Sequence, residues 1–207
     1  MANVKVSRRE RAERTRAKII QTAYRLLVEK GWDSTTMQLV ADEAGFAVQT
    51  VYFVFGTKSQ LVASVEEYAI AGGSSRAELG EWGSLVARED DPQFLICSFV
   101  ETDTRVKSRL APLIAALGGA IPAELAPARD RESGRDRFFG SLVDRLAELG
   151  ALRPGLSRER ALDRIRALNA LETYTDLTRR RGWTDREWID WMSELLVAQL
   201  TRPAAKP

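Results

Sequence analysis

Apolar side chains recur at helical spacing along most of this sequence, and no stretch alternates between apolar and polar residues as a β-strand would. The clearest early example predicts a helix over residues 7–30, ended by Gly31. Its apolar face consists of Ile19, Ile20, Ala23, Leu26 and Leu27. The same pattern predicts helices over residues 37–44, 47–53, 58–71, 92–117, 129–149, 157–181 and 184–200. The predicted fold class is therefore all-α.

Glycine, proline and capping residues give the boundaries between these helices. We expect loops at residues 72–75 and 118–127, and a disordered tail from about residue 203. Pro112 should kink or break its helix near Leu110, because proline lacks the backbone N–H of a helix interior. Thr35 or Thr36 can cap the helix at 37–44, and Thr184 with Glu187 matches a capping box for the last helix.

Residues 37–53 form the most informative segment, because two short helices are separated there by a very short turn. This arrangement is typical of a helix-turn-helix. Ala41 is small where the second helix must approach closely, and Gly45 lies where the turn needs a positive φ. A helical hairpin with the same pattern that binds nothing is the alternative interpretation.

The second helix of this pair leaves Val48, Gln49, Thr50 and Phe53 free to enter a DNA groove. Gln49 can form two hydrogen bonds with an adenine edge, and Val48 or the Thr50 methyl can contact a thymine methyl.

Three stretches, 35–41, 44–46 and 50–61, together resemble the DNA-binding domain of the TetR (tetracycline-repressor-like) family. The resemblance covers roughly residues 14–65. It implies a three-helix helix-turn-helix DNA-binding domain over residues 1–67. A C-terminal helical domain that binds a ligand and forms the dimer would follow over residues 68–202.

The resemblance also assigns roles to individual residues. Thr36 would lie against a phosphate, Gln38 near the groove wall, Tyr52 on the DNA backbone and Lys58 on a phosphate. The full predicted DNA-binding set is Arg16, Thr36, Gln38, Val48, Gln49, Thr50, Tyr52, Phe53 and Lys58.

This chain departs from the commonest family pattern at three places in the second helix of the motif. Ala47 replaces the usual serine cap, Val48 stands where a polar residue is common, and Phe53 with Val54 replaces a frequent His/Tyr pair. These changes put the contacts at those positions in doubt.

The last predicted helix has an apolar stripe rich in tryptophan, which suits a buried interface between two subunits. The stripe consists of Trp188, Trp191, Met192, Leu195 and Leu196. Its position matches the helices through which TetR-like relatives dimerise. The alternative is that the stripe packs only inside its own subunit.

Residues of the C-terminal region could also line an effector pocket, since such pockets are mostly apolar with a few polar anchors. The aromatic candidates are Trp82, Phe94, Phe99, Phe138 and Phe139, and the polar ones are Glu101, Asn169, Thr173 and Tyr174. Ordinary core packing is the alternative for each.

Charge and composition narrow the chemistry further. The net charge of the chain is only +2, but basic residues concentrate in residues 1–18. This segment is either an arm that binds phosphates or a solvated helix face. The sequence has no histidine and one cysteine, Cys97, so His-based catalysis, His-ligated zinc and an internal disulfide are excluded. Cys97 lies in an apolar run, which predicts that its thiol is a small buried apolar group. The alternative is that Cys97 is a redox sensor. We predict no enzyme activity, no metal and no cofactor.

Taken together, these patterns predict a cytoplasmic homodimer that binds double-stranded operator DNA. There is no membrane span or secretion signal in the pattern. The expected protein is a repressor, released from a palindromic operator by a small hydrophobic or amphipathic ligand. The alternatives are an activator, or a TetR-like interaction protein with weakened DNA reading.

Overall fold

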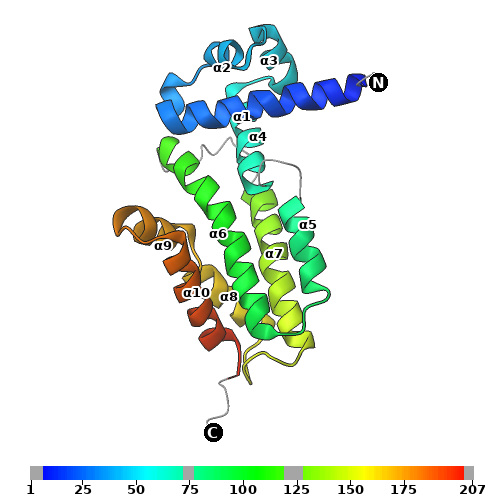
Figure 1. The fold of residues 1–207 in the computed structure, drawn as a ribbon, viewed down its shortest axis with the longest axis vertical. Coiled ribbons are helices and arrows are strands. Elements are labelled where there is room, and N and C mark those ends of the chain that lie inside the picture. The colour runs from blue at the N-terminus through cyan, green and yellow to red at the C-terminus, as the bar shows by residue number, and fades with distance from the viewer. Residues whose placement is uncertain (1–6, 72–76, 119–127, 203–207) are drawn as a thin grey trace, which may run out of the picture. The chain divides into compact units, whose positions relative to one another are not determined.

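The computed structural model describes residues 7–71, 77–118 and 128–202, and confirms the predicted all-α class. Within these ranges there is no strand, only an isolated bridge between Leu152 and Thr201. The elements (Figure 1) are α1 Arg8–Ser34, α2 Met37–Ala44, α3 Val48–Phe55, α4 Lys58–Ala71, α5 Ala77–Val86, α6 Pro92–Ala116, α7 Ala128–Glu148, α8 Arg158–Leu168, α9 Leu171–Thr175, the π-helical turn η1 Asp176–Arg180 and α10 Asp185–Leu200. Loop 72–75, most of loop 118–127 and the tail 203–207 lie outside the described residues.

The chain forms two compact units, each with its own core. The first consists of Met1–Gly73 with Pro112–Pro127, and the second of Ser74–Ala111 with Ala128–Pro207. The division between them therefore falls inside α6, at Pro112.

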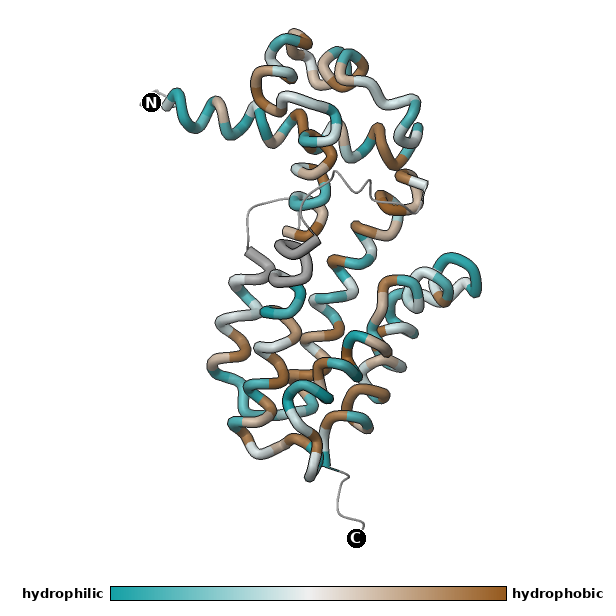
Figure 2. Tube along the Cα trace, turned by 180° about the vertical axis from the view of Figure 1, so that it is seen from behind, coloured by the Kyte–Doolittle hydropathy of each residue, from teal (hydrophilic) through white to brown (hydrophobic). Residues whose placement is uncertain are grey.

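The first unit is organised around α1, with α2 and α3 beside it (Figure 1). A capping box of Ser7 and Glu10 starts α1, and its first turns are mainly hydrophilic (Figure 2). Gly31 leaves helical geometry at φ 77°, as its predicted role as a helix end requires, and one more turn follows to Ser34. The core residues of this unit include Ile19, Ala23, Leu27, Val40, Ala44, Val51, Phe55, Leu61 and Val65.

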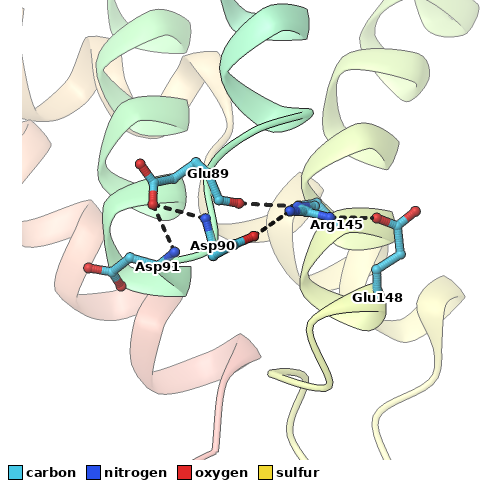
Figure 3. Close-up of polar contacts among 5 residues, drawn as sticks. All are labelled: Glu89, Asp90, Asp91, Arg145 and Glu148. Carbon is cyan, nitrogen blue, oxygen red and sulfur yellow. Dashed lines mark hydrogen bonds and ion pairs between the residues drawn. The ribbon is translucent and has the colours of Figure 1, made fainter.

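The second unit is a bundle with a single apolar core. Its largest fully buried side chains are Trp188, Phe99 and Phe139. The turn that leads into α6 is tied to α7 by Arg145 (Figure 3). The Arg145 guanidinium donates to the Glu89 carbonyl oxygen at 3.1 Å and to the Asp90 carboxylate at 2.6 Å. The Glu89 carboxylate in turn accepts from the backbone N–H groups of Asp90 and Asp91, which fixes the start of α6.

The single helix predicted over residues 157–181 is wrong, because α8 ends at Leu168 and a new helix begins at Leu171. Asn169 is completely buried at this break. Its side-chain N–H donates to Asp103 at 2.8 Å, and its side-chain oxygen accepts from the Lys107 ammonium at 2.5 Å. Since Lys107 also lies 2.5 Å from Asp103, the three side chains form a closed polar cluster, which we call the Asn169 cluster. Burial lowers the pKa of Lys107, against the opposing effect of Asp103.

Two other differences concern α6 and its surroundings. No break occurs near Leu110, because α6 continues through Pro112 to Ala116. Pro112 removes one helical hydrogen bond and its ring crowds the carbonyl group four residues earlier, a cost that the burial of Ala111 and Leu113 on either side can offset. The structure also contains helix α5, at Ala77–Val86, for which the sequence pattern predicts no start or end.

Candidate nucleic-acid interface

Helices α2 and α3 form a helix-turn-helix whose angle is held by backbone and apolar contacts. Gly45 ends α2 in the left-handed region, at φ 74° and ψ 37°, where a Cβ would be strained. The N–H of Phe46 then donates to the Ala41 carbonyl oxygen at 3.0 Å. Val40 and Val51 are fully buried at the junction, so the direction of α3 is fixed by the core.

One face of α3 is presented to solvent. Gln49, Tyr52 and Phe53 lie at positions i, i+3 and i+4, and all three are exposed. Tyr52 is 51% exposed and Phe53 is 92% exposed. Neighbouring aromatic side chains this exposed are typical of a surface that binds another molecule. The opposite face carries Val51 and Phe55 into the core. Val48 and Thr50 are half-buried at the edges of the exposed face.

The start of α2 brings two predicted contact residues to the surface. Thr36 is the N-cap, and its hydroxyl oxygen accepts from the Leu39 N–H at 3.1 Å. Gln38 is exposed and donates to the Asp42 carboxylate at 2.7 Å. Gln38 therefore has to exchange this internal partner if it contacts a base.

Both cationic residues of the predicted DNA-binding set, Arg16 and Lys58, rest on aromatic rings. Arg16 lies 4.7 Å from the centre of the Phe55 ring and donates to the Ser64 hydroxyl at 2.9 Å. Lys58 lies 4.0 Å from the centre of the Trp32 ring and donates to the Trp32 carbonyl oxygen. Burial lowers the pKa of Lys58. Both side chains are thus engaged inside the unit in this conformation.

Lys18 is a further exposed cation that the predicted contact set did not contain. Its ammonium lies 5.5 Å from the centre of the Phe46 ring, beside the turn of the motif. The available signal was its place in the basic segment 1–18, but the segment alone does not tell which cations reach the motif.

The N-terminus of α3 lacks a side-chain cap, because Ala47 occupies the N-cap position with an extended backbone of φ −66° and ψ 142°. This geometry already suits a serine. We expect Ala47→Ser to raise the free energy of unfolding by about 1 kcal/mol, by satisfying a free N–H of the first turn. Urea unfolding of the variant measures the change. Ala47→Val is the matched control, since valine cannot accept that hydrogen bond, and equal stability of the two variants would contradict the prediction.

The predicted dimer stripe divides between core and surface. Trp188, Met192 and Leu196 are fully buried in the core of their own subunit. Trp191 is 37% exposed and Leu195 is half-buried. A single α-helical stripe therefore faces two environments, and only Trp191 and Leu195 are available to a partner.

The predicted ligand residues are likewise distributed over different places. Trp82, Phe99 and Phe138 pack on one another, with ring centres 4.9–5.8 Å apart, and form a closed aromatic cluster together with Phe139. The indole N–H of Trp82 donates to the Ser141 hydroxyl at 2.9 Å. Asn169 belongs to the polar cluster described above. Thr173 is half-buried, Tyr174 is buried, and Phe94 is half exposed.

A hollow of the second unit lies elsewhere, in a groove between α6 and α10 with a volume of about 640 Å³. Glu101 is the one predicted ligand residue that lines it. Cys97 lines the same groove as a free, half-buried thiol. We call this hollow the α6–α10 groove.

The described residues contain no group of three or more His, Cys, Asp or Glu side chains placed to hold a metal ion. No helix in 7–71, 77–118 or 128–202 combines the length and apolar character that crossing a membrane requires.

Comparison with known proteins finds similarity in the helix-turn-helix segment and in the fold. Residues 19–65 match the model of the bacterial regulatory proteins of the tetR family. Curated proteins gave no match by sequence.

Solved structures resemble this chain along nearly their whole length. NalD, the secondary repressor of the MexAB-OprM multidrug efflux pump in Pseudomonas aeruginosa, is 22% identical, with 93% of this chain and 98% of NalD covered at a TM-score of 0.70. The fatty acid degradation regulator FadR from Bacillus halodurans is 16% identical, with coverage of 88% and 94% and a TM-score of 0.71. SmeT, solved as a complex with triclosan, is 19% identical, with coverage of 94% and 99% and a TM-score of 0.67. The chain therefore carries the N-terminal helix-turn-helix domain of the tetR family over residues 19–65, and its fold is that of TetR-family regulators.

Proposed function

We propose that this protein is a transcriptional repressor that binds operator DNA through α2 and α3. The observation that carries the proposal is the exposed face of α3, where Gln49, Tyr52 and Phe53 stand on a helix fixed by its buried side. The tetR-family domain and the repressor role given for NalD support it. Because bacterial DNA lies in the cytoplasm, the protein acts there.

The residues of the motif divide between reading bases and holding the backbone. Gln49 pairs with an adenine edge, while Val48, Phe53 and the Thr50 methyl contact thymine methyls. Thr36, Tyr52 and Arg16 lie on the DNA backbone, with Gln38 beside the groove wall. Lys58 donates to a DNA phosphate in the complex, and its hydrogen bond to the Trp32 carbonyl oxygen is broken.

The functional unit is a homodimer, because two recognition helices related by a twofold axis read a palindromic operator with half-sites about one DNA turn apart. The proposed interface uses the exposed side of α10 around Trp191 and Leu195. Release from the operator follows when a small hydrophobic or amphipathic ligand binds the dimer and favours a spacing of the helices that does not fit DNA. The complex of SmeT with triclosan supports a ligand for this fold.

The dimer proposal predicts that Trp191→Glu weakens self-association. Loss of a large aromatic side chain at an interface typically costs 2 kcal/mol or more, so we expect the dimer dissociation constant to rise at least about thirtyfold. Sedimentation equilibrium measures it. Val28→Glu is the matched control, because Val28 is 36% exposed, as Trp191 is 37% exposed, but lies on α1. Unchanged association of the Trp191 variant would remove α10 from the interface.

A mobility-shift assay tests the DNA-binding proposal directly. The full-length protein is titrated at moderate salt against DNA that flanks its own gene, and against random DNA of the same length. We expect a clear preference for the flanking DNA. Equal binding to both DNAs would contradict a specific operator beside the gene and would favour a TetR-like interaction protein. The absence of a side-chain cap at Ala47, at the start of α3, is compatible with that alternative.

A further inference from the structure

The exposed face of α3 carries no charged side chain. All eight residues of α3, Val48–Phe55, are neutral, and Gln49, Tyr52 and Phe53 form its exposed side. In the major groove a guanine edge is normally read by arginine or lysine, which donate to its O6 and N7 atoms. Because α3 has neither, its own side chains suit adenine and thymine rather than guanine.

The cations beside the motif stand on other helices. Arg16 on α1 and Lys58 on α4 are held by aromatic rings and by hydrogen-bond acceptors of their own unit. Lys18 on α1 lies beside the turn, with its ammonium 5.5 Å from the centre of the Phe46 ring. These positions suit contacts with phosphates, which carry no sequence information directly. Base reading therefore falls to neutral side chains.

Phe53 offers a base nothing but apolar surface. It is 92% exposed, and the core side of α3 is already occupied by Val51 and Phe55. The apolar group on the major-groove edge of a base is the C5-methyl of thymine, and phenylalanine is one of the side chains that contact it. Val48 and Thr50, half-buried at the edges of the same face, add two smaller apolar groups. The face is therefore suited to methyl groups.

The chemistry of Phe53 also differs from that of Gln49, which lies one helical turn earlier. The two are separated by about 6 Å along the axis of α3, so they can reach different base pairs. Gln49 reads adenine with two hydrogen bonds, which restrict its own pair to A·T. A phenyl ring responds to the methyl group of thymine and not to the O4 acceptor beside it. It therefore cannot distinguish thymine from 5-methylcytosine, which has the same methyl group and an amino donor at position 4.

From these observations we infer that α3 recognises pyrimidine 5-methyl groups, with Phe53 as the principal reader. The operator is then rich in A·T pairs, and the pair that faces Phe53 accepts 5-methylcytosine as it accepts thymine. Methylation of a cytosine at that pair therefore strengthens binding. The inference rests on the function proposed above and names the class of DNA that the recognition helix reads.

Selection of duplex DNA by the full-length protein from two random libraries tests the inference. The libraries differ only in one pyrimidine, which is thymine in the first and uracil in the second. The thymine library should yield a palindrome rich in A·T pairs. The uracil library, which lacks every 5-methyl group, should enrich the same sequence at least about tenfold less. Equal enrichment from the two libraries, or a palindrome dominated by G·C pairs, would overturn the inference.

Single substitutions in the selected operator then locate the methyl group. Each thymine is replaced by uracil in both half-sites, and fluorescence anisotropy measures binding. At the pair that faces Phe53 the dissociation constant should rise about fifteenfold, since a buried methyl group contributes roughly fourfold in each half-site. Cytosine at that pair should bind as weakly as uracil, and 5-methylcytosine as tightly as thymine. Equal binding of cytosine and 5-methylcytosine would overturn the proposed acceptance of methylated DNA.

The variant Phe53→Ala tests the assignment to this side chain. It should bind the thymine and uracil operators equally, because the ring that contacts the methyl group is gone. Val28→Ala is the matched control, since Val28 is an exposed apolar residue on α1, and it should keep the full difference. A change in stability alone would not alter the difference between the two operators. An undiminished difference in the Phe53 variant would exclude Phe53 as the reader.

Failure of this inference is distinct from failure of the proposed repressor function. A folded, dimeric protein that enriches one palindrome equally from both libraries would still bind DNA specifically, and only methyl recognition would be wrong. A protein that enriches nothing from the thymine library would contradict the repressor function itself, and methyl recognition with it.

Discussion

A protein with alanine at both Gln49 and Tyr52 is expected to bind its operator at least about a hundredfold more weakly than the wild type. A base contact with two hydrogen bonds is worth about 1–3 kcal/mol, and a dimer makes it in both half-sites. The Tyr52 side chain adds a backbone contact in each. The loss should concern operator DNA far more than random DNA, because phosphate contacts of the remaining cations persist.

Fluorescence anisotropy with labelled operator measures this loss, and sedimentation confirms that the variant stays dimeric. Both side chains are exposed, so the fold should be unaffected. Gln21→Ala, an exposed glutamine on α1, is the control. If the double variant bound the operator as the wild type does, α3 would not be the recognition helix.

The second large effect concerns stability. Asp103→Ala should lower the free energy of unfolding by about 3–5 kcal/mol, because it leaves the buried Lys107 ammonium without its counter-ion. The Asn169 oxygen and the face of the Trp188 ring, 5.2 Å away, would remain near that charge, together with the opposing charges of Glu172 and Arg135. Urea unfolding of the full-length protein measures the change.

Two comparisons separate burial from pairing. The double variant Asp103→Leu with Lys107→Met removes both charges and should cost much less than Asp103→Ala alone. The exposed pair of Arg158 and Asp144 has the same 2.5 Å separation, and Asp144→Ala should cost less than about 1 kcal/mol. If Asp103→Ala and Asp144→Ala had equal effects, the Asn169 cluster would not be a buried ion pair.

The sequence predicts the first unit well because its signals are local. Gly45 needs its positive φ within a short turn, and Thr36 caps the helix that begins at the next residue. The capping box of Thr184 and Glu187 was predictable in the same way. Each of these features depends on residues only a few positions apart, so a single sequence contains the necessary information.

The features that sequence reasoning missed depend on distant partners. The break after α8 is set by Asn169, whose partner Asp103 lies 66 positions earlier. Likewise, nothing in the spacing of Trp188 and Trp191 tells which one enters the core, because a stripe this wide faces two surfaces. Four of the five aromatic candidates, Trp82, Phe99, Phe138 and Phe139, pack against one another, and the hollow lined by Glu101 does not include them. Tertiary packing decides all three.

The most direct test of the central claim is selection of random duplex DNA on the purified full-length protein, followed by sequencing of the bound pool. The account predicts enrichment of a palindrome whose half-sites are about one helical turn apart. The Gln49 and Tyr52 variant, taken through the same selection, should not enrich it. If a folded, dimeric wild-type sample enriched no sequence, the exposed face of α3 would not read DNA, and the repressor function would be contradicted.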